Sequence, residues 1–143
     1  MNDTPFSVRI AVRTYELDSL GHVNQAVYHS YAEVARTELF RAAGCRMDWL
    51  AERKIGPVLL ESTITFRREL RADDEVDVSA DVKFGAGKTF RMDSTITKVD
   101  GSTSAEITCT IGLMDLRERK LVTDPREAFV SAGTDLSVLS GSG

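Results

Sequence analysis

The sequence predicts an α+β fold in which an antiparallel sheet of five strands wraps around one long helix. Two segments alternate apolar and polar residues strictly, which indicates strands with one face on a core and the other in water. A third segment repeats its apolar residues at helical spacing, over a face wide enough that much of the helix must be buried. The helix is therefore expected to fill the curve of the sheet.

The strands are predicted from this alternation and from the turns between them. Apolar residues occupy alternate positions from Val76 to Phe84 and from Ala105 to Leu113, which defines strands at 75–84 and 104–114. Segments 6–14, 58–70 and 89–99 have a less regular pattern and are predicted as three further strands. Gly85-Ala86-Gly87 and Asp100-Gly101-Ser102 supply the turns on either side of 89–99.

The helix is predicted at 25–43, where apolar residues recur every three or four positions. These residues are Val27, Tyr31, Val34, Ala35, Leu39 and Ala42, widened by a second set of Tyr28, Ala32, Ala35 and Leu39. Asn24 is a favourable N-cap, and Gly44 lies where a helix commonly ends. Residues 47–53 are expected to form a short second helix before Gly56-Pro57.

Length and composition predict a single globular domain at residues 1–133, followed by a flexible tail at 134–143 that is rich in Ser and Gly. The net charge of −4 argues against nucleic acid as the main partner. No stretch approaches the ~20 apolar residues that span a bilayer, and the first residues lack a secretion signal. A cytoplasmic protein with no membrane partner is expected, in which Cys45 and Cys109 stay reduced.

The segment from Tyr15 to Tyr28 carries the chemistry. It places Asp18, Gly21, His22 and Asn24 directly before the predicted helix start. The first N–H groups of a helix are unsatisfied and carry the positive end of its dipole, so they can stabilise an oxyanion on a carbonyl placed there. An aspartate a few residues upstream could attack that carbonyl or activate a water, which is what acyl transfer requires. The same residues also fit an ordinary turn followed by a cap.

A family resemblance favours the catalytic alternative. The run Asp18-x-x-Gly21-His22-Val23-Asn24-x-Ala26-x-Tyr28, followed by Tyr31, Glu33 and Arg36, resembles the signature of the hotdog-fold 4-hydroxybenzoyl-CoA thioesterase family. The likeness is greatest to plant acyl-ACP thioesterases and bacterial acyl-CoA thioesterases. The benzoyl-CoA enzyme itself lacks the His-Val-Asn sequence, which argues against an aromatic substrate.

The resemblance implies a hotdog fold, with five strands around a central helix, and a homodimer or homotetramer with active sites at the protomer interface. It implies that Asp18 is the nucleophile or general base and that the backbone amide near Gln25 polarises the thioester carbonyl. His22 and Asn24 would orient the substrate or water. Reactions of this type need no cofactor, and the two histidines, His22 and His29, have no ligand set around them that would suggest a metal.

Other residues have two interpretations each. Glu61 either faces the site as a further catalytic carboxylate or lies on the solvent face with Thr63 and Thr65. The candidates for substrate binding are Tyr28 and Tyr31, as core or pocket wall, and Lys83, Lys88 and Arg91, as phosphate contacts or a solvated hairpin. A basic run, Arg67, Arg68 and Arg71, forms either a solvated edge or a docking patch for an acidic carrier protein, and Met47 and Trp49 could close the acyl end of a pocket.

The sequence thus predicts hydrolysis of an acyl thioester of CoA or an acyl carrier protein to the free acid and thiol. Two other functions fit the same fold. One is a non-catalytic module that binds acyl thioesters, and the other is a hotdog dehydratase. Acyl chain length and the identity of the carrier are left open by the sequence.

Overall fold

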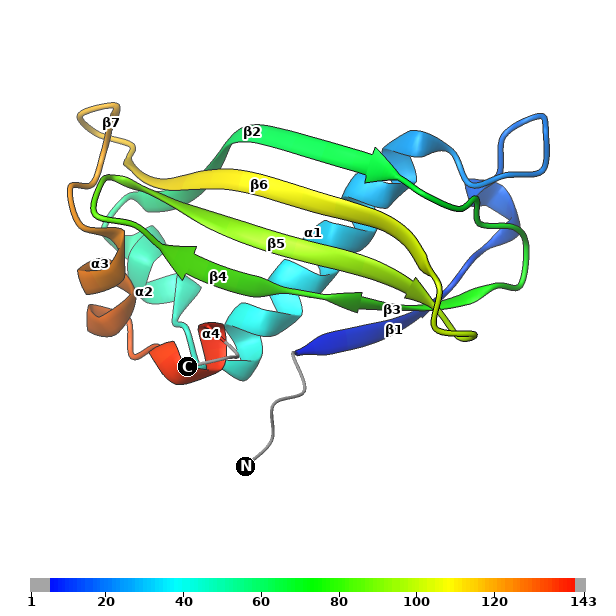
Figure 1. Cartoon of the computed structure of the whole chain (residues 1–143). Helices are drawn as coiled ribbons and strands as arrows, with labels where there is room; N and C mark the ends of the chain where they lie inside the picture. Colours follow the sequence, from blue (N-terminus) through cyan, green and yellow to red (C-terminus); the bar gives the residue numbers. More distant parts are fainter. Residues whose placement is uncertain (1–5, 141–143) are drawn as a thin grey trace.

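The computed structural model describes residues 6–140. Its sheet is antiparallel throughout and has the strand order β1-β3-β5-β6-β2, with β4 paired to β5 and β7 to β6. The strands are β1 (Ser7–Ala11), β2 (Ile55–Phe66), β3 (Glu75–Ser79), β4 (Asp81–Phe84), β5 (Thr89–Lys98), β6 (Thr103–Asp115) and β7 (Lys120–Leu121). The curved sheet lies along the long helix α1 (Gln25–Ala42), as Figure 1 shows. The predicted α+β architecture is confirmed.

The strand count differs from the prediction in two places. The segment predicted as one strand at 75–84 is divided into β3 and β4, because the Ser79 Oγ accepts the Thr95 N–H at 2.8 Å where a ladder hydrogen bond would otherwise form. The two-residue strand β7 was not predicted, since a segment so short carries no alternation. With β3 and β4 taken as one interrupted strand, five strands still form the body of the sheet.

Helix α1 begins where the sequence predicted. The Asn24 side chain accepts the Ala26 N–H at 2.9 Å and caps the helix, and Gly44 follows its end with a positive φ of 76°. Its buried residues are Tyr28, Tyr31, Ala32, Ala35, Leu39 and Phe40. Val34, which the sequence placed in the apolar stripe, is instead exposed. The helix packs on β1, β3, β5 and β6, and the Tyr28 ring meets Phe66 at the end of β2.

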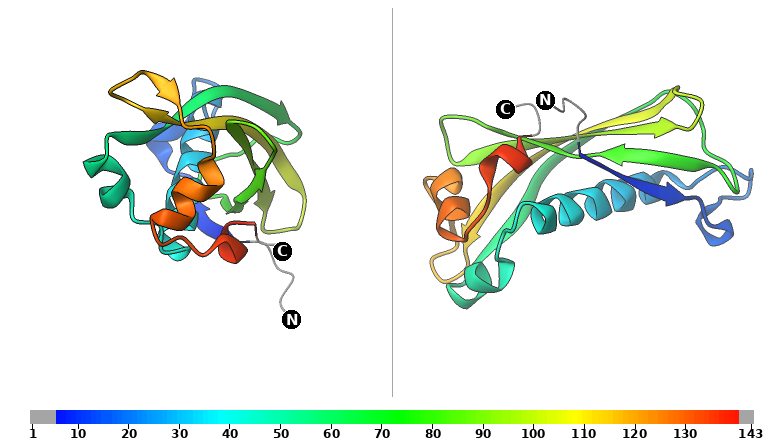
Figure 2. Two further views of the ribbon diagram at one scale, coloured as in Figure 1. Left: turned by 90° about the vertical axis from the view of Figure 1, so that its left-hand side faces the viewer. Right: turned by 90° about the horizontal axis from the view of Figure 1, so that it is seen from below.

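The flexible tail predicted from residue 134 is wrong for the residues that the structure describes. After α2 (Met47–Glu52) and α3 (Pro125–Ser131), the chain forms a fourth helix, α4 (Leu136–Leu139), against the end of α1 (Figure 2). Leu139 is fully buried, and the Asp135 N–H donates to the Ala43 carbonyl oxygen at 2.8 Å. Leu136 and Leu139 are three positions apart and lie on one side of this short helix. The sequence prediction gave more weight to the Ser and Gly content of the segment than to these two leucines. Residues 141–143 lie outside the described residues.

Within residues 6–140, strand β2 forms one edge of the sheet and pairs only with β6. A bulge at Leu60 reverses its alternation, so that Leu59 pairs with Ile111 and Glu61 with Thr110, residues on opposite faces of β6. Leu59, Leu60 and Phe66 are each about half exposed, at 52%, 48% and 50%. An edge of twelve residues with exposed apolar side chains is unusual for a protein that acts alone.

The remaining structural predictions concern thiols and membranes. Cys45 and Cys109 are both free cysteines, and Cys109 is buried. No helix among residues 6–140 has the length and apolar character required to cross a bilayer.

Candidate active site

A pocket of about 420 Å³ opens at the N-terminal end of α1. Its walls are the segment before the helix, the first helical turn and the end of β2. Of the five residues predicted to be catalytic, it brings together Asp18, His22, Asn24 and Gln25. The remaining lining residues are Val23, Tyr28, Phe66, Arg67, Arg68 and Glu69.

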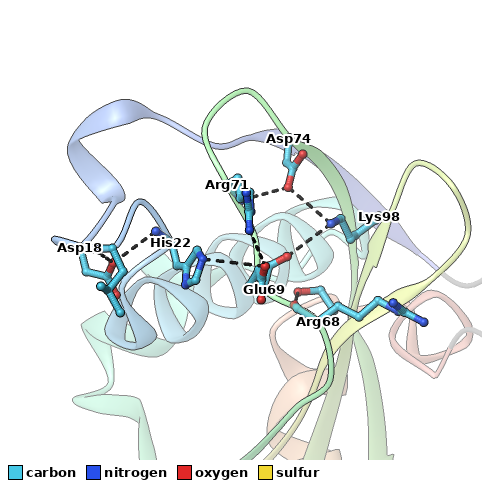
Figure 3. Close-up of polar contacts among 9 residues, drawn as sticks. Asp18, His22, Arg68, Glu69, Arg71, Asp74 and Lys98 are labelled. Carbon is cyan, nitrogen blue, oxygen red and sulfur yellow. Dashed lines mark hydrogen bonds and ion pairs between the residues drawn. The ribbon is translucent and has the colours of Figure 1, made fainter.

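Asp18 is held by a short turn that closes on itself. The Asp18 N–H donates to the His22 carbonyl oxygen at 2.7 Å, and the Gly21 N–H donates back to the Asp18 carbonyl oxygen at 3.1 Å. Gly21 has a φ of 79°, a conformation that favours glycine. The carboxylate Oδ1 accepts the backbone N–H groups of Leu20 and His22 at 2.9 and 3.2 Å (Figure 3).

These contacts combine the two interpretations of the motif, because the aspartate is both a turn residue and a pocket residue. Oδ1 is fully used by the turn, whereas Oδ2 accepts no hydrogen bond within residues 6–140. A carboxylate fixed through one oxygen presents the other in a defined direction, which is the requirement for a base or a nucleophile.

The first turn of α1 supplies a donor to the same pocket. The Asn24 side chain takes the Ala26 N–H, and the Asn24 carbonyl oxygen accepts the Val27 N–H at 2.9 Å. The Gln25 N–H, which precedes both of these donors, has no acceptor in the described part of the chain, and Gln25 lines the pocket. An unsatisfied N–H at a helix start is suited to bind an oxyanion. Asn24 therefore acts here as a cap, with its amide oxygen already engaged.

Glu69 is a pocket residue that the sequence reasoning missed. Its Oε1 lies 3.8 Å from the His22 Nε2 and 2.9 Å from the Arg71 guanidinium (Figure 3). The hydrogen bond from Arg71 and, second, the charge of His22 lower the pKa of Glu69, so it is an anion over the whole neutral range. A backbone bridge between His22 and Arg71 joins the two segments. The only sequence signal was its position beside the basic run that ends β2.

Glu16 is a second residue that the sequence reasoning missed. Its Oε1 accepts the Tyr31 hydroxyl at 2.7 Å and the Arg13 N–H at 2.8 Å, and its carbonyl oxygen accepts the Asn24 N–H at 2.9 Å. Burial, and then the hydrogen bond to Glu16, raise the pKa of the Tyr31 hydroxyl, which stays protonated. These bonds tie the segment before Asp18 to the helix that follows it.

The two tyrosines therefore differ in role. Tyr31 is buried and is not among the residues that line the pocket, so it belongs to the core. Tyr28 does line the pocket, and its ring packs edge-on against Phe66 with centroids 5.0 Å apart. Burial raises the pKa of Tyr28, which makes its hydroxyl a donor rather than an anion.

Glu61 lies apart from this pocket. The bulge at Leu60 turns it to the face of the sheet opposite α1, where it is exposed, in agreement with the solvent interpretation.

Among the other candidates, Met47 lines a separate cavity, and Trp49 packs under the Arg53 guanidinium at 3.5 Å. Arg67 pairs with Glu106 at 3.2 Å, and the Arg68 guanidinium points away from Asp18 (Figure 3).

The basic residues of the β4–β5 hairpin also lie outside this pocket. Lys83 and Arg91 each pair with Asp93 at 3.0 Å. Lys88 lies beyond them on the hairpin and has no ion pair among residues 6–140. Figures 1 and 2 show this hairpin at the opposite end of the molecule from the segment that carries Asp18. A contact between these residues and substrate bound at Asp18 of the same chain is therefore not supported by the geometry.

Asp81 makes the stability of the hairpin depend on pH. It lies directly opposite Asp93, and each carboxylate has one buried oxygen with no hydrogen bond. Burial raises the pKa of Asp81, attraction to Lys83 opposes this, and repulsion from Asp93 adds to it. The folded protein thus holds this proton to higher pH than the unfolded chain does, so ionisation of Asp81 destabilises the fold as the pH rises through the raised pKa.

We expect Asp81→Asn to raise the Tm at pH 7 and to lose that advantage near pH 4, where the unfolded carboxyl also begins to bind its proton. Thermal unfolding at both pH values measures the difference. Asp77→Asn is the matched control, because a hydrogen bond from Arg9 lowers the pKa of Asp77 and the sign of its effect is reversed. A lower Tm for Asp81→Asn at pH 7 would contradict the prediction.

Within residues 6–140 no group of three or more His, Cys, Asp or Glu side chains is placed to hold a metal ion. The pocket therefore offers a fixed carboxylate, a free backbone donor and a histidine beside an anionic glutamate as its chemical groups.

Comparisons with known proteins identify the family of this chain. Residues 12–132 match the family model of the thioesterase-like superfamily. The chain is 33% identical to the chloroplastic acyl-acyl carrier protein thioesterase ATL3 of Arabidopsis thaliana over 92 residues, which are 64% of this chain and 48% of that protein. It thus spans about half the length of the plant relative.

Two further relatives match over most of their length. The chain is 27% identical to the long-chain acyl-CoA thioesterase FadM of Escherichia coli, over 78% of this chain and 85% of that protein. A crystal structure of a Thermus thermophilus thioesterase complexed with coenzyme A and Zn is 30% identical, with a TM-score of 0.74 over 99% of this chain and 98% of that one. The chain therefore belongs to the thioesterase-like superfamily and has the hotdog fold of its thioesterases.

Proposed function

We propose that this protein hydrolyses an acyl thioester of CoA or an acyl carrier protein to a free acid and a thiol, with Asp18 as its catalytic carboxylate. One observation carries the proposal. The free Oδ2 of Asp18 and the unpaired N–H of Gln25 belong to the same pocket, so an acyl carbonyl bound at the helix start lies within reach of both. The turn and the helix cap are complete without the free Oδ2 and the unpaired N–H. The fold therefore does not require these two groups to lie together.

The reaction can be written with Asp18 as a general base. The thioester carbonyl oxygen accepts the Gln25 N–H, and Asp18 removes a proton from water as its oxygen bonds to the carbonyl carbon. The oxyanion forms against the helix start, where one such donor is worth about 3 kcal/mol in the transition state. The C–S bond then breaks, and the thiolate takes up a proton. In the alternative, Asp18 bonds to the carbonyl carbon itself, and water cleaves the resulting anhydride.

Glu69 and His22 are proposed to orient the thioester and to stabilise charge at the pocket rim. The charged rim fits a polar carrier, and the named relatives act on both carrier types, acyl carrier protein in the plant enzyme and CoA in the bacterial one.

We further propose that the protein is a homodimer formed through β2. This strand is a long, unpaired edge with three half-exposed apolar side chains, and only one charged residue lies between Ile55 and Phe66. Natural sheets usually shorten, charge or cover such an edge. The opposite edge, β1, has five residues and carries Arg9, so it is protected.

Release of free thiol from a panel of acyl-CoA and acyl-carrier-protein substrates tests the proposed activity. Hydrolysis of at least one saturated thioester is the expected result. Saturable binding without thiol release would instead support a binding module, and loss of water from a 3-hydroxyacyl thioester would support a dehydratase.

Glu69→Gln should lower kcat by about two- to fivefold, the scale of a partly exposed ion pair, because His22 would lose its anionic neighbour 3.8 Å away. The matched control is Glu75→Gln, which breaks an exposed 3.8 Å pair with Arg9 away from the pocket and should leave kcat and KM at their wild-type values. Equal kinetics for the two variants would remove Glu69 from the site.

A further inference from the structure

The loop at residues 67–74, between β2 and β3, forms one wall of the Asp18 pocket and carries Glu69. These eight residues contain no helix or strand. A loop held only at its two ends is mobile, and a charged group on such a loop is poorly placed for chemistry. The position of Glu69 beside His22 therefore requires contacts that fix this loop from other parts of the fold.

Ser104 on β6 holds the residue that precedes Glu69. The Ser104 hydroxyl donates to the Arg68 carbonyl oxygen at 2.7 Å, and the Ser104 carbonyl oxygen accepts the N–H groups of Arg67 and Arg68 at 2.8 and 3.1 Å. The Tyr28 hydroxyl, in the same pocket, is also hydrogen-bonded to Ser104. Ser104 is fully buried, where a hydroxyl is costly unless it is hydrogen-bonded. The core thus contains a serine whose hydroxyl serves the wall of the pocket.

Lys98 at the end of β5 holds Glu69 itself. Its Nζ donates to the Glu69 carbonyl oxygen at 3.3 Å and pairs with the Asp74 carboxylate at 3.6 Å (Figure 3). The same carboxylate accepts the Arg71 N–H at 2.9 Å, so the loop closes around this lysine. The Lys98 side chain is only 25% exposed, and partly buried ion pairs are screened less by salt than exposed ones.

A third contact joins the loop to the segment that carries Asp18. The carbonyl oxygen of Leu70, a fully buried residue, accepts the Val23 N–H at 2.9 Å. Three successive carbonyl oxygens of the loop are thus held by β6, by β5 and by the segment before α1. The Glu69 side chain stays exposed while its backbone is fixed, with its Oε1 3.8 Å from the His22 Nε2.

We infer that Ser104 and Lys98 are positioning residues of the active site, which fix the loop so that Glu69 stays beside His22. Their effect on catalysis rests on the proposed function, because Glu69 and His22 are assigned there to the pocket rim. Neither Ser104 nor Lys98 is among the residues that line the pocket, so both act through the loop and not on the substrate.

The NMR signals of the histidine rings test this inference directly, because the chain has only two histidines, His22 and His29. Ser104→Ala and Lys98→Met should each move the His22 ring signals toward their positions in Glu69→Gln and leave those of His29 in place. Unmoved His22 signals in both variants would overturn the inference, and movement in one variant alone would overturn the role of the other residue. Lys98→Met changes a side chain near the surface and keeps the test available if Ser104→Ala does not fold.

Two matched controls separate this effect from a general loss of stability. Ser94→Ala removes a buried hydroxyl from β5, and Lys120→Met removes an exposed lysine from β7. Neither residue lies on the loop or lines the Asp18 pocket, so both variants should leave the His22 signals unchanged. Movement of these signals in the controls as large as in Ser104→Ala would contradict a specific role for Ser104.

Kinetics show whether the two residues act through Glu69. Ser104→Ala and Lys98→Met should each reproduce the loss of kcat expected for Glu69→Gln, about two- to fivefold. Combined with Glu69→Gln, either variant should add little, because the group that it positions is already absent. Losses that multiply in the double variants would show that Ser104 and Lys98 act independently of Glu69, and would overturn the inference.

The positioning role and the proposed function fail in distinguishable ways. If the wild type releases no thiol from any substrate while the His22 signals respond to both variants, the proposed function is wrong and the fixed loop stands. If thiol is released and the His22 signals respond to neither variant, the function stands and the positioning role is wrong.

Discussion

Asp18→Asn is expected to fold normally and to lose turnover by about 10²- to 10⁴-fold, the usual contribution of a general base. The amide keeps an oxygen at the position of Oδ1, so the N–H groups of Leu20 and His22 retain their acceptor and the turn stays closed. It provides no anion at the position of Oδ2, the oxygen that accepts no hydrogen bond within residues 6–140. The measurement is thiol release under saturating acyl-CoA, with kcat and KM determined separately.

Two controls separate chemistry from folding in this experiment. Ser19→Ala changes an exposed residue of the same turn that does not line the pocket, and near wild-type kinetics are expected. Binding of a non-hydrolysable thioether analogue should be similar in wild type and Asp18→Asn, since the lost group acts mainly in the transition state. Near wild-type turnover by Asp18→Asn would contradict the proposed mechanism.

The second large effect is expected at Glu16, a positioning residue that touches neither pocket nor substrate. Glu16→Ala leaves the buried Tyr31 hydroxyl without its acceptor, which costs about 1–3 kcal/mol of stability, and it releases the exposed Arg13 N–H. The segment that precedes Asp18 then loses its attachment to α1. Misplacement of a reacting group by about 1 Å can cost 10²-fold in rate, so we expect kcat to fall by about that factor while KM changes little.

Rescue by a conservative variant distinguishes positioning from catalysis at this residue. Glu16→Gln retains an oxygen that can accept both hydrogen bonds, and it should recover most of kcat and of the Tm. Glu38→Ala is the matched control, because it removes an exposed carboxylate that pairs with Arg41 at 2.7 Å on the surface of α1. If Glu16→Gln is as inactive as Glu16→Ala, the charge itself is needed, and the positioning role is wrong.

Strand β2 is the less protected of the two sheet edges, since its apolar side chains are half exposed. The proposed pairing of this edge with a second copy of the chain would cover them.

The local part of the site was predictable from the sequence because its contacts span few residues. Asp18, Gly21, His22 and Asn24 form a turn and a cap with hydrogen bonds between neighbours at most four positions apart. Helix α1 and its N-cap follow from periodicity and side-chain chemistry in the same way. Such contacts depend on residue identity and spacing, and both are visible in the sequence.

The contributions of Glu69, Glu16 and Glu61 depended on tertiary structure. Glu69 reaches His22 across 47 positions, and Tyr31 reaches Glu16 across 15, so neither pairing appears as a sequence pattern. Glu61 faces away from α1 because of one bulge residue, Leu60, which moves every later side chain of β2 to the other face.

The fold as a whole shows the same division between local and tertiary features. By itself the sequence determined an antiparallel sheet around a buried, capped helix with an aspartate before its first turn, because periodicity and capping are properties of neighbouring residues. The tertiary structure alone decided that α4 docks on α1, that β2 is left as an open edge, and that the cavity lined by Met47 and the Asp18 pocket lie at opposite ends of that edge. These features arise from packing between segments distant in the chain, which no local pattern encodes.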